Sequence, residues 1–422
     1  MIKFAIKTLG CKVNQYESQV IRENLQKNGY FETDVESADL VIVNSCTVTS
    51  RADGKTRGFI RKFNKINPQA KIVVTGCSAV YPEDIKTLES ISGVYKVVPN
   101  RDKLDIPFIL KSIYGMRCGI KSISEEVSGF DSHTRAFVKI QDGCDQNCSY
   151  CKVSLVRGAS RSREEPKAFE EIIRLAEKGY REMVLTGICL GSWKGEGDRN
   201  LSDLLERVDA LPGDFRIRLS SIEPNHIGPA LIDIVARSAK ICRHFHIPLQ
   251  SGSDRVLSLM KRRYNTAKFR ELVADIRSKI PLAGITMDII AGFPGETEKD
   301  IEHTAGFIEE IQPSRLHVFK YSDRKNTASY DMTPKIDPVV AKKRVEHLIA
   351  IGTCLQEKFC KKFIGKEVEV LIEEKTAGGS FTGYTREYVQ VKVPGSIGSP
   401  AGSLVRVKPT GIDPESRIAL LG

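Results

Sequence analysis

The sequence has few aromatic residues, no long apolar run and no export signal. Aromatic side chains make up only 7% of its 422 residues, although 41% are hydrophobic, which is enough for a sizeable globular core. No run of 18 or more apolar residues occurs, so we expect neither a transmembrane helix nor a membrane partner. The first ten residues alternate as a strand and lack the apolar stretch of a signal peptide. We therefore expect a cytoplasmic protein.

The number of cysteines excludes a fully paired disulfide framework. The chain has eleven of them, an odd number, and in a reducing cytosol thiols bind metal or stay free. The chain carries 64 Lys and Arg against 53 Asp and Glu, and the resulting net charge of +11 weakly favours an RNA substrate over an acidic protein. At about 150 residues per domain, the length predicts two to three domains.

Strands and helices alternate along most of the chain, which predicts parallel sheets covered by helices. Residues 1–112 form the first such α/β unit, and residues 113–134, rich in Gly, Ser and charge, form a linker. A second unit at 135–360 has six strand–helix pairs and predicts a partial (β/α)6 barrel. Residues 361–422 contain short alternating strands separated by Gly-rich turns, which predicts a small all-β barrel.

The strands expected in the N-terminal sheet lie at 2–8, 40–44, 72–75 and 94–98, with helices at 17–28 and 82–91. The strands expected in the barrel lie at 137–140, 183–186, 217–220, 245–247, 285–290 and 316–319. Between the barrel strands we expect helices at 166–178, 201–210, 229–238, 267–280 and 298–311, and a last long helix at 339–362. Thr297 and Asp300 have the spacing of a helix-capping box.

Three cysteines follow the first strand of the predicted barrel, where barrels of this type place their active sites. Cys144, Cys148 and Cys151 lie within eight residues, so their thiols can converge on one metal centre. A cubane iron–sulfur cluster takes thiolate ligands, and three of them leave one iron open. A structural zinc site and unrelated thiols are the alternatives. Cys189 lies on another loop of the same barrel but has no ligand spacing.

A second set of cysteines follows three successive strands of the N-terminal unit. Cys11, Cys46 and Cys77 each come directly after a small polar or glycine residue at the end of a strand. Because parallel strands have their carboxyl ends at one edge of the sheet, these thiols can also share one centre. Three scattered buried thiols are the alternative.

The spacing of Cys144, Cys148 and Cys151 resembles that of the radical S-adenosylmethionine (SAM) superfamily. Within it, the order of further motifs along nearly the whole chain resembles the methylthiotransferases. These motifs are Thr8-Leu9-Gly10-Cys11-Lys12-Val13-Asn14-Gln15-Tyr16-Glu17, Asn44-Ser45-Cys46, Thr75-Gly76-Cys77, Arg161-Ser162-Arg163, Ser220-Ser221-Ile222-Glu223-Pro224, Pro248-Leu249-Gln250-Ser251-Gly252 and Gly292-Phe293-Pro294-Gly295-Glu296-Thr297.

The resemblance implies a catalyst with two [4Fe–4S] clusters and SAM. Cys144, Cys148 and Cys151 would hold the cluster that generates a radical from SAM. Cys11, Cys46 and Cys77 would hold an auxiliary cluster carrying the sulfur that is methylated and transferred. Radical chemistry suits an aromatic C–H carbon without an acidic proton, because acid–base chemistry alone cannot functionalise it.

The opening around Cys11 most resembles the subgroup that converts N6-threonylcarbamoyladenosine, next to the tRNA anticodon, to its 2-methylthio derivative. The alternatives within the family are isopentenyladenosine in tRNA and an aspartate of a ribosomal protein. A non-catalytic iron–sulfur RNA-binding protein is the alternative of another class. The threonylcarbamoyl group bears a carboxylate, so we expect a basic residue in the substrate cavity, and the sequence does not identify it.

Several residues near the predicted strand ends are expected to contact SAM. Tyr150 is at the position where the family usually has an aromatic residue near adenine, although packing is an equal alternative. For Arg157, a salt bridge is the alternative. The full set of expected SAM contacts is Tyr150, Gly187, Ser221, Glu223, Gln250 and Arg157.

The expected partners are tRNA and an electron donor such as flavodoxin or ferredoxin, and the sulfur donor is unknown. Residues 361–422 resemble the TRAM domain, a small β barrel that binds tRNA. A basic helix face supports the same partner, with a solvated face as the alternative. Phe59, Ile60, Phe63 and Ile66 lie on the complementary face. The basic face consists of Arg51, Lys55, Arg57, Arg61, Lys62 and Lys65.

Overall fold

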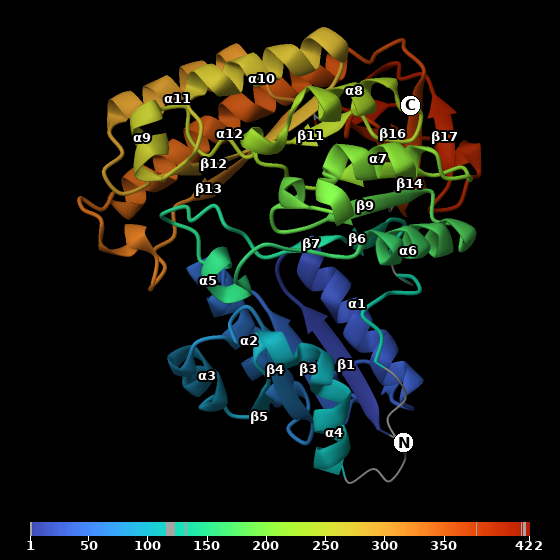
Figure 1. Cartoon of the computed structure of the whole chain (residues 1–422), viewed down its shortest axis with the longest axis vertical. Helices are drawn as coiled ribbons and strands as arrows, with labels where there is room; N and C mark the ends of the chain where they lie inside the picture. The colour runs from blue at the N-terminus through green and yellow to red at the C-terminus, as the bar shows by residue number, and fades with distance from the viewer. Residues whose placement is uncertain (1, 115–122, 131–132, 377, 415, 417–418) are drawn as a thin grey trace.

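A computed structural model arranges the chain as an N-terminal parallel sheet, a partial barrel above it and a C-terminal sheet beside the barrel (Figure 1). The structure describes residues 2–114, 123–130, 133–376, 378–414, 416 and 419–422. The predicted linker at 113–134 therefore lies partly outside the described residues. In the part of the chain that is described, no helix is long and apolar enough to cross a membrane.

The N-terminal sheet is fully parallel, with strand order β2-β1-β3-β4-β5. Its strands are β1 (Lys3–Thr8), β2 (Phe31–Glu32), β3 (Leu40–Ser45), β4 (Lys71–Gly76) and β5 (Val94–Val97). Helices α1 (Lys12–Lys27) and α4 (Ile106–Tyr114) cover one face, and α2 (Ser50–Ile66) and α3 (Pro82–Glu89) cover the other. This double cover explains the unbroken apolar run of β3, in which successive side chains enter opposite cores.

The barrel consists of two three-stranded parallel sheets, β10-β9-β6 and β11-β12-β13. Isolated bridges from Ile217 to Ile241 and from Ser221 to His246 join the two sheets into one curved wall. Its strands are β6 (Ala136–Lys139), β9 (Glu182–Thr186), β10 (Arg216–Leu219), β11 (His244–His246), β12 (Gly284–Ala291) and β13 (Arg315–Lys320). The structure thus has the predicted six-stranded partial barrel.

Helices cover the outer side of this wall and bury the largest core of the molecule. They are α6 (Glu165–Glu177), α7 (Leu201–Asp209), α8 (Pro229–Arg237), α10 (Thr266–Lys279), α11 (Glu298–Ile311) and α12 (Pro338–Lys361). Each lies within one residue of its predicted bounds. The capping box of α11 is confirmed, since Thr297 accepts from the Asp300 backbone and Asp300 accepts from that of Thr297.

The first helix begins five residues earlier than the sequence predicts. Its first turn carries Asn14, a polar residue that is nonetheless buried, because its side chain donates to the Leu9 and Ser45 carbonyls. The start of this helix was predicted from the periodicity of its apolar residues. A buried polar residue interrupts that periodicity, so the first turn was not recognised as helical. The two-residue strand β2 was also missed, being too short for a detectable pattern.

The C-terminal sheet has six strands in the order β17-β14-β15-β16-β19-β18. They are β14 (Val368–Lys375), β15 (Phe381–Thr385), β16 (Gln390–Val393), β17 (Leu404–Val407), β18 (Gly411–Ile412) and β19 (Ala419–Leu421). The alternating pattern predicts strands at 367–373, 388–393 and 403–408, which correspond to β14, β16 and β17, whereas β15, β18 and β19 were not predicted. Within the described residues, the end strands β17 and β18 do not pair, so closure into the predicted barrel is not confirmed.

A buried charge network fixes the C-terminal sheet to the barrel. The Glu182 carboxylate is fully buried and forms ion pairs with Arg135 at 3.1 Å, Arg216 at 2.6 Å and Arg218 at 2.7 Å. Arg216 and Arg218 also donate to the backbone carbonyls of Tyr384 and Thr385 at the end of β15, and Arg218 donates to that of Arg386 in the turn that follows. This turn therefore has a fixed position against the barrel strands.

Candidate active site between two sheet edges

The three N-terminal cysteines lie at one edge of the sheet, as predicted. Cys11, Cys46 and Cys77 follow β1, β3 and β4, which are neighbours in the sheet. The Cys77 backbone N–H donates to the Ser45 carbonyl at 3.1 Å. Gly10 has a φ of 101°, and a Cβ there would lie 3.0 Å from the Cys46 sulfur. The loop that carries Cys11 thus lies directly against Cys46.

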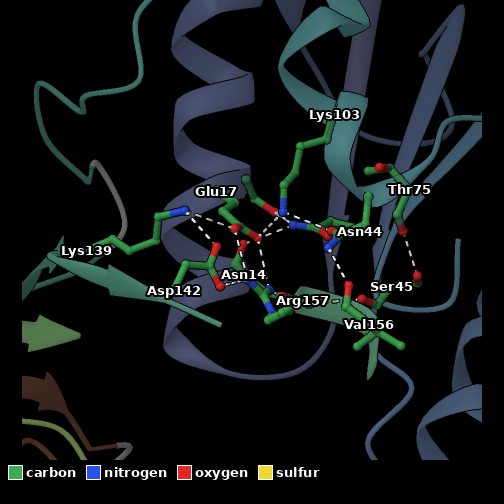
Figure 2. Close-up of polar contacts among 12 residues, drawn as sticks. Asn14, Glu17, Asn44, Ser45, Thr75, Lys103, Lys139, Asp142, Val156 and Arg157 are labelled. Carbon is green, nitrogen blue, oxygen red and sulfur yellow. Dashed lines mark hydrogen bonds and ion pairs between the residues drawn. The ribbon is translucent and has the colours of Figure 1, made fainter. Parts of the chain in front are cut away.

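Side-chain hydrogen bonds hold these three loops together. Asn14 donates to the Ser45 carbonyl, and Asn44 donates to the Asn14 carbonyl, which ties α1 to the end of β3 (Figure 2). The Ser45 hydroxyl donates to the Thr75 carbonyl at 2.5 Å and accepts from the Ser78 backbone at 3.1 Å, which ties β3 to β4. The positions of the three thiols are therefore fixed before any ligand binds.

The donor set at this edge suits an iron–sulfur cluster. Burial, together with the neighbouring Cys77 and Cys11 thiols, raises the pKa of the Cys46 thiol to about 11. Such thiols resist charging together unless a metal compensates them. Among the described residues, no three potential ligands are close enough to share a single ion. Thiols on separate irons of a cluster do not require that closeness, so three thiols fit a cluster with one open iron.

The barrel cysteines lie on the loop between β7 (Gln141–Asp142) and α5 (Val153–Arg157). Each of the three sulfurs accepts a hydrogen bond. The Gln146 and Val153 backbone N–H groups donate to Cys144 and Cys151 at 3.4 Å. Arg262 donates to Cys148 at 3.0 Å. Hydrogen bonds to the sulfurs stabilise thiolates and tune cluster potentials, so this loop also fits a cluster.

Cys189, for which the sequence offered no partner, lies beside this loop. A hydrogen bond with the Cys189 thiol is the main cause that lowers the pKa of Cys144. The Cys189 sulfur is also 3.7 Å from Nδ1 of His226. Cys189 therefore adds a fourth thiol next to the barrel triplet.

Most of the predicted SAM contacts lie at the carboxyl ends of the barrel strands. Gly187 follows β9, Ser221 and Glu223 follow β10, and Gln250 follows β11 with a φ of 68°. A side chain at Gly187 would meet the Gln141 side-chain oxygen at 2.9 Å. These positions share one side of the barrel with the cysteine loop, which is where the sequence predicts the cofactor.

Arg262 is a residue of this site that the sequence did not reveal. Its guanidinium forms an ion pair with Glu223 and lies 3.5 Å from the Tyr150 hydroxyl. The Tyr150 ring packs edge-on against Phe293, with centroids 6.4 Å apart. Arg262 thus joins the cysteine loop to the end of β10. A single Arg between two charged neighbours, Lys261 and Arg263, gave no sequence signal for this role.

Arg157 has a different position from the SAM contact that the sequence predicts. Its guanidinium is buried and donates to Glu17 at 3.1 Å, Asp142 at 2.9 Å and Asn14 at 2.5 Å. Glu17 also pairs with Lys103 at 2.6 Å and Lys139 at 3.2 Å (Figure 2). The salt-bridge alternative is therefore the one observed, and Arg157 joins the barrel to α1.

Other contacts bring the two cysteine-bearing edges face to face. Lys152, next to Cys151, pairs with Asp84 of α3 at 3.1 Å. Arg324, after β13, donates to Thr47, next to Cys46, at 2.7 Å. The carboxyl edge of the N-terminal sheet therefore faces the carboxyl edge of the barrel. A cavity of about 710 Å³ opens beside this junction, lined by Tyr16, Ala79, Lys103, Gln141, Arg157 and Arg161 among others.

The predicted basic face forms on α2. The helix spans the predicted residues in spite of Gly58, and Thr49 caps it by accepting from the Ala52 backbone. Ile60 and Phe63 are buried beneath it, as expected, whereas Ile66 is exposed. Arg57 is half-buried, and the other five basic side chains, Arg51, Lys55, Arg61, Lys62 and Lys65, are exposed.

Two family models match the chain. The model described as "Uncharacterized protein family UPF0004" matches residues 3–96, and that of the Radical SAM superfamily matches residues 138–308. The solved structure of the radical S-adenosylmethionine methyltransferase TsrM from Kitasatospora setae is similar, with a TM-score of 0.57 and 16% identity. The match covers 78% of this chain and 77% of TsrM. The barrel and its cysteine loop thus define a radical SAM enzyme.

Curated relatives give the family. Threonylcarbamoyladenosine tRNA methylthiotransferase MtaB of Thermotoga maritima is 36% identical over 96% of this chain and 94% of the relative. MtaB of Bacillus subtilis is 36% identical over 97% of this chain and 94% of the relative. The tRNA-2-methylthio-N(6)-dimethylallyladenosine synthase of Thermodesulfovibrio yellowstonii is 34% identical over 96% of this chain and 95% of the relative. The chain belongs to the radical SAM methylthiotransferase family, and its cofactors are SAM and [4Fe–4S] clusters.

We predict that Glu17→Gln destabilises the protein at neutral pH by about 3–5 kcal/mol, because it removes a buried carboxylate shared by three cations and leaves the buried Lys103 with no carboxylate partner. Burial acts to raise the pKa of Glu17, but Lys103, Arg157 and Lys139 together hold it well below its usual range. The stabilisation is therefore present above the unfolded-state pKa of about 4.3 and is lost as the pH falls through the lower, folded-state value.

Urea denaturation of the wild type and the variant between pH 7 and pH 3 measures this effect. The difference between them should stay constant down to about pH 5 and shrink below about pH 4.3. Glu206→Gln is the control, because Glu206 and its partner Arg237 are more than half exposed, and it should cost less than about 1 kcal/mol. An equal effect of both substitutions would contradict the role of Glu17.

Proposed function

We propose that this enzyme converts N6-threonylcarbamoyladenosine in tRNA to its 2-methylthio derivative. The observation that carries the proposal is the pair of cysteine triplets on facing sheet edges, in a chain 36% identical to MtaB relatives. A methylthiolation needs both a sulfur and a carbon radical at one substrate atom, and two facing metal centres suit that need. The isopentenyladenosine alternative has the support of relatives at 34% identity.

In this proposal each triplet holds one [4Fe–4S] cluster. Cys144, Cys148 and Cys151 bind the cluster next to SAM, and Cys11, Cys46 and Cys77 bind the auxiliary cluster. When bound, the clusters and SAM supply the radical, the methyl group and the sulfur. Tyr150, Gly187, Ser221, Glu223 and Gln250 position SAM, and Arg262 positions both Cys148 and Glu223 through its two contacts. The buried Arg157 holds the two edges together.

The proposed partners are tRNA and a low-potential electron donor of the flavodoxin or ferredoxin type, in the cytoplasm. The exposed basic face of α2 would contact tRNA phosphates, together with a TRAM-like unit at 361–422. The other proposed units are the methylthiotransferase domain at 1–112, the linker at 113–134 and the radical SAM domain at 135–360.

The division of labour between the clusters gives a direct test. We predict that Cys77→Ala abolishes methylthiolation but keeps reductive cleavage of SAM to 5′-deoxyadenosine, because the barrel triplet is intact. Iron should fall from about eight to about four atoms per chain in anaerobically reconstituted protein. Product formation is measured by mass spectrometry of digested tRNA, and 5′-deoxyadenosine is measured by chromatography.

Two further variants make this test specific. Cys354→Ala removes an exposed free thiol on α12 and should change neither reaction. Cys151→Ala should abolish both. Loss of SAM cleavage in a folded Cys77→Ala variant would contradict the assignment, and absence of cleavage in the wild type would favour a non-catalytic RNA-binding protein.

The proposed contact of the basic face of α2 with tRNA leads to a separate prediction. The double reversal Lys62→Glu and Lys65→Glu should weaken tRNA binding by about tenfold at low salt and flatten the dependence of affinity on salt concentration. The same change at the exposed Lys342 and Lys343 of α12 is the matched control and should have a smaller effect. Filter binding across a salt series measures both, and equal effects would contradict a specific role of α2.

A further inference from the structure

In the part of the chain that the structure describes, most cations buried around the inner side of the barrel pair with a carboxylate. Arg315 and Lys12 do not, and Arg315 lies against the Tyr384 hydroxyl. Arg135, Arg216 and Arg218 pair with Glu182. The other buried cations at the junction with the N-terminal sheet are also paired, namely Lys103, Lys139, Arg157, Arg262 and Arg324. These groups need their charges for holding the fold, so they are poor candidates for binding a substrate anion.

Lys12 has no such contact in the described part of the chain. It is half-buried, and among the described residues its ammonium has no hydrogen-bond partner and no carboxylate within 4.0 Å. It is the first residue of α1, next to Cys11, and α1 packs against β6 of the barrel (Figure 1). A partly desolvated ammonium without a counter-ion is costly, so this position favours an anionic ligand.

The side chains around Lys12 suit a nucleobase that bears a polar substituent. Tyr388, His244 and His317 lie within electrostatic reach of its ammonium. His244 is only 3% exposed, and its Nδ1 has no partner among the described residues. Its ring lies 4.8 Å from that of Tyr388, which stacks on Tyr384 at 4.7 Å. The site therefore combines a free cation, an unpaired ring nitrogen and an aromatic surface.

We propose that the Lys12 ammonium binds the carboxylate of the threonylcarbamoyl group and so selects this substrate over isopentenyladenosine. The inference deepens the proposed function and rests on it. Cys11 and Lys12 are consecutive, so one nucleoside can place its C2 atom at the auxiliary centre and its N6 substituent at Lys12. An isopentenyl group has no charge and would leave the ammonium unpaired, and a site built for a charged partner rejects an analogue that lacks it.

The test compares two anticodon stem–loop RNAs, one with N6-threonylcarbamoyladenosine and one with its methyl ester, which lacks the negative charge. The wild type should prefer the acid by about 10- to 100-fold in kcat/KM, the range for one charge-assisted hydrogen bond. Lys12→Met should lose this preference, with its activity on the ester within about threefold of wild type. Fluorescence anisotropy without SAM should show the same pattern in RNA affinity.

Lys27→Met is the matched control, because it removes the same charge from the exposed end of the same helix, and it should keep the wild-type preference. Lys12→Arg keeps the charge and should retain a preference for the acid. Iron content and SAM cleavage equal to wild type show that Lys12→Met is folded and loaded.

Several results would overturn the assignment. If the wild type treated acid and ester alike, or if Lys12→Met kept the preference, Lys12 would not bind the carboxylate. The first of these comparisons needs no variant, so it stands even if Lys12→Met does not fold. If the wild type methylthiolated neither RNA but modified one with isopentenyladenosine, the proposed substrate itself would be wrong, and the role of Lys12 would fall with it.

Discussion

The buried Glu17 carboxylate is the contact on which the arrangement of the site depends, because it joins α1 to both sides of the junction. It is almost fully buried, and it is stable there only because Lys103, Lys139 and Arg157 surround it. Arg157 ends the short helix after the barrel cysteines, and Glu17 lies in the helix that begins after Cys11. One charge cluster thus sets the relative position of the loops that carry the two triplets.

The sequence predicted the strands and the cysteine sets well, since both depend on local patterns. Strands buried on both faces are continuous apolar runs, as in Leu40–Ser45, and turn residues mark their ends. Once the strands are known, the rule that parallel strands end at one edge brings Cys11, Cys46 and Cys77 together without any structural information. The same rule placed Ser221, Glu223 and Gln250 on the side of the barrel cysteines.

Pairings between distant residues could not be predicted in this way. Arg157 and Glu17 are 140 positions apart, and the sequence cannot state which of 64 cations meets which of 53 carboxylates. The contacts of Arg262 and the proposed role of Lys12 were missed for the same reason. Lys12 is distinguished by having no counter-ion among the described residues. This can be recognised only once the carboxylate partners of the neighbouring cations are known. Short strands such as β18 lack the length for a pattern.

The most direct test of the central claim is mass spectrometry of tRNA nucleosides from cells that lack this gene and from cells in which it is restored. The account predicts that 2-methylthio-N6-threonylcarbamoyladenosine disappears with the gene, that its unmethylthiolated precursor accumulates, and that restoration reverses both changes. A response of 2-methylthio-isopentenyladenosine alone would keep the chemistry but contradict the substrate. No response of either nucleoside would contradict the assignment to tRNA.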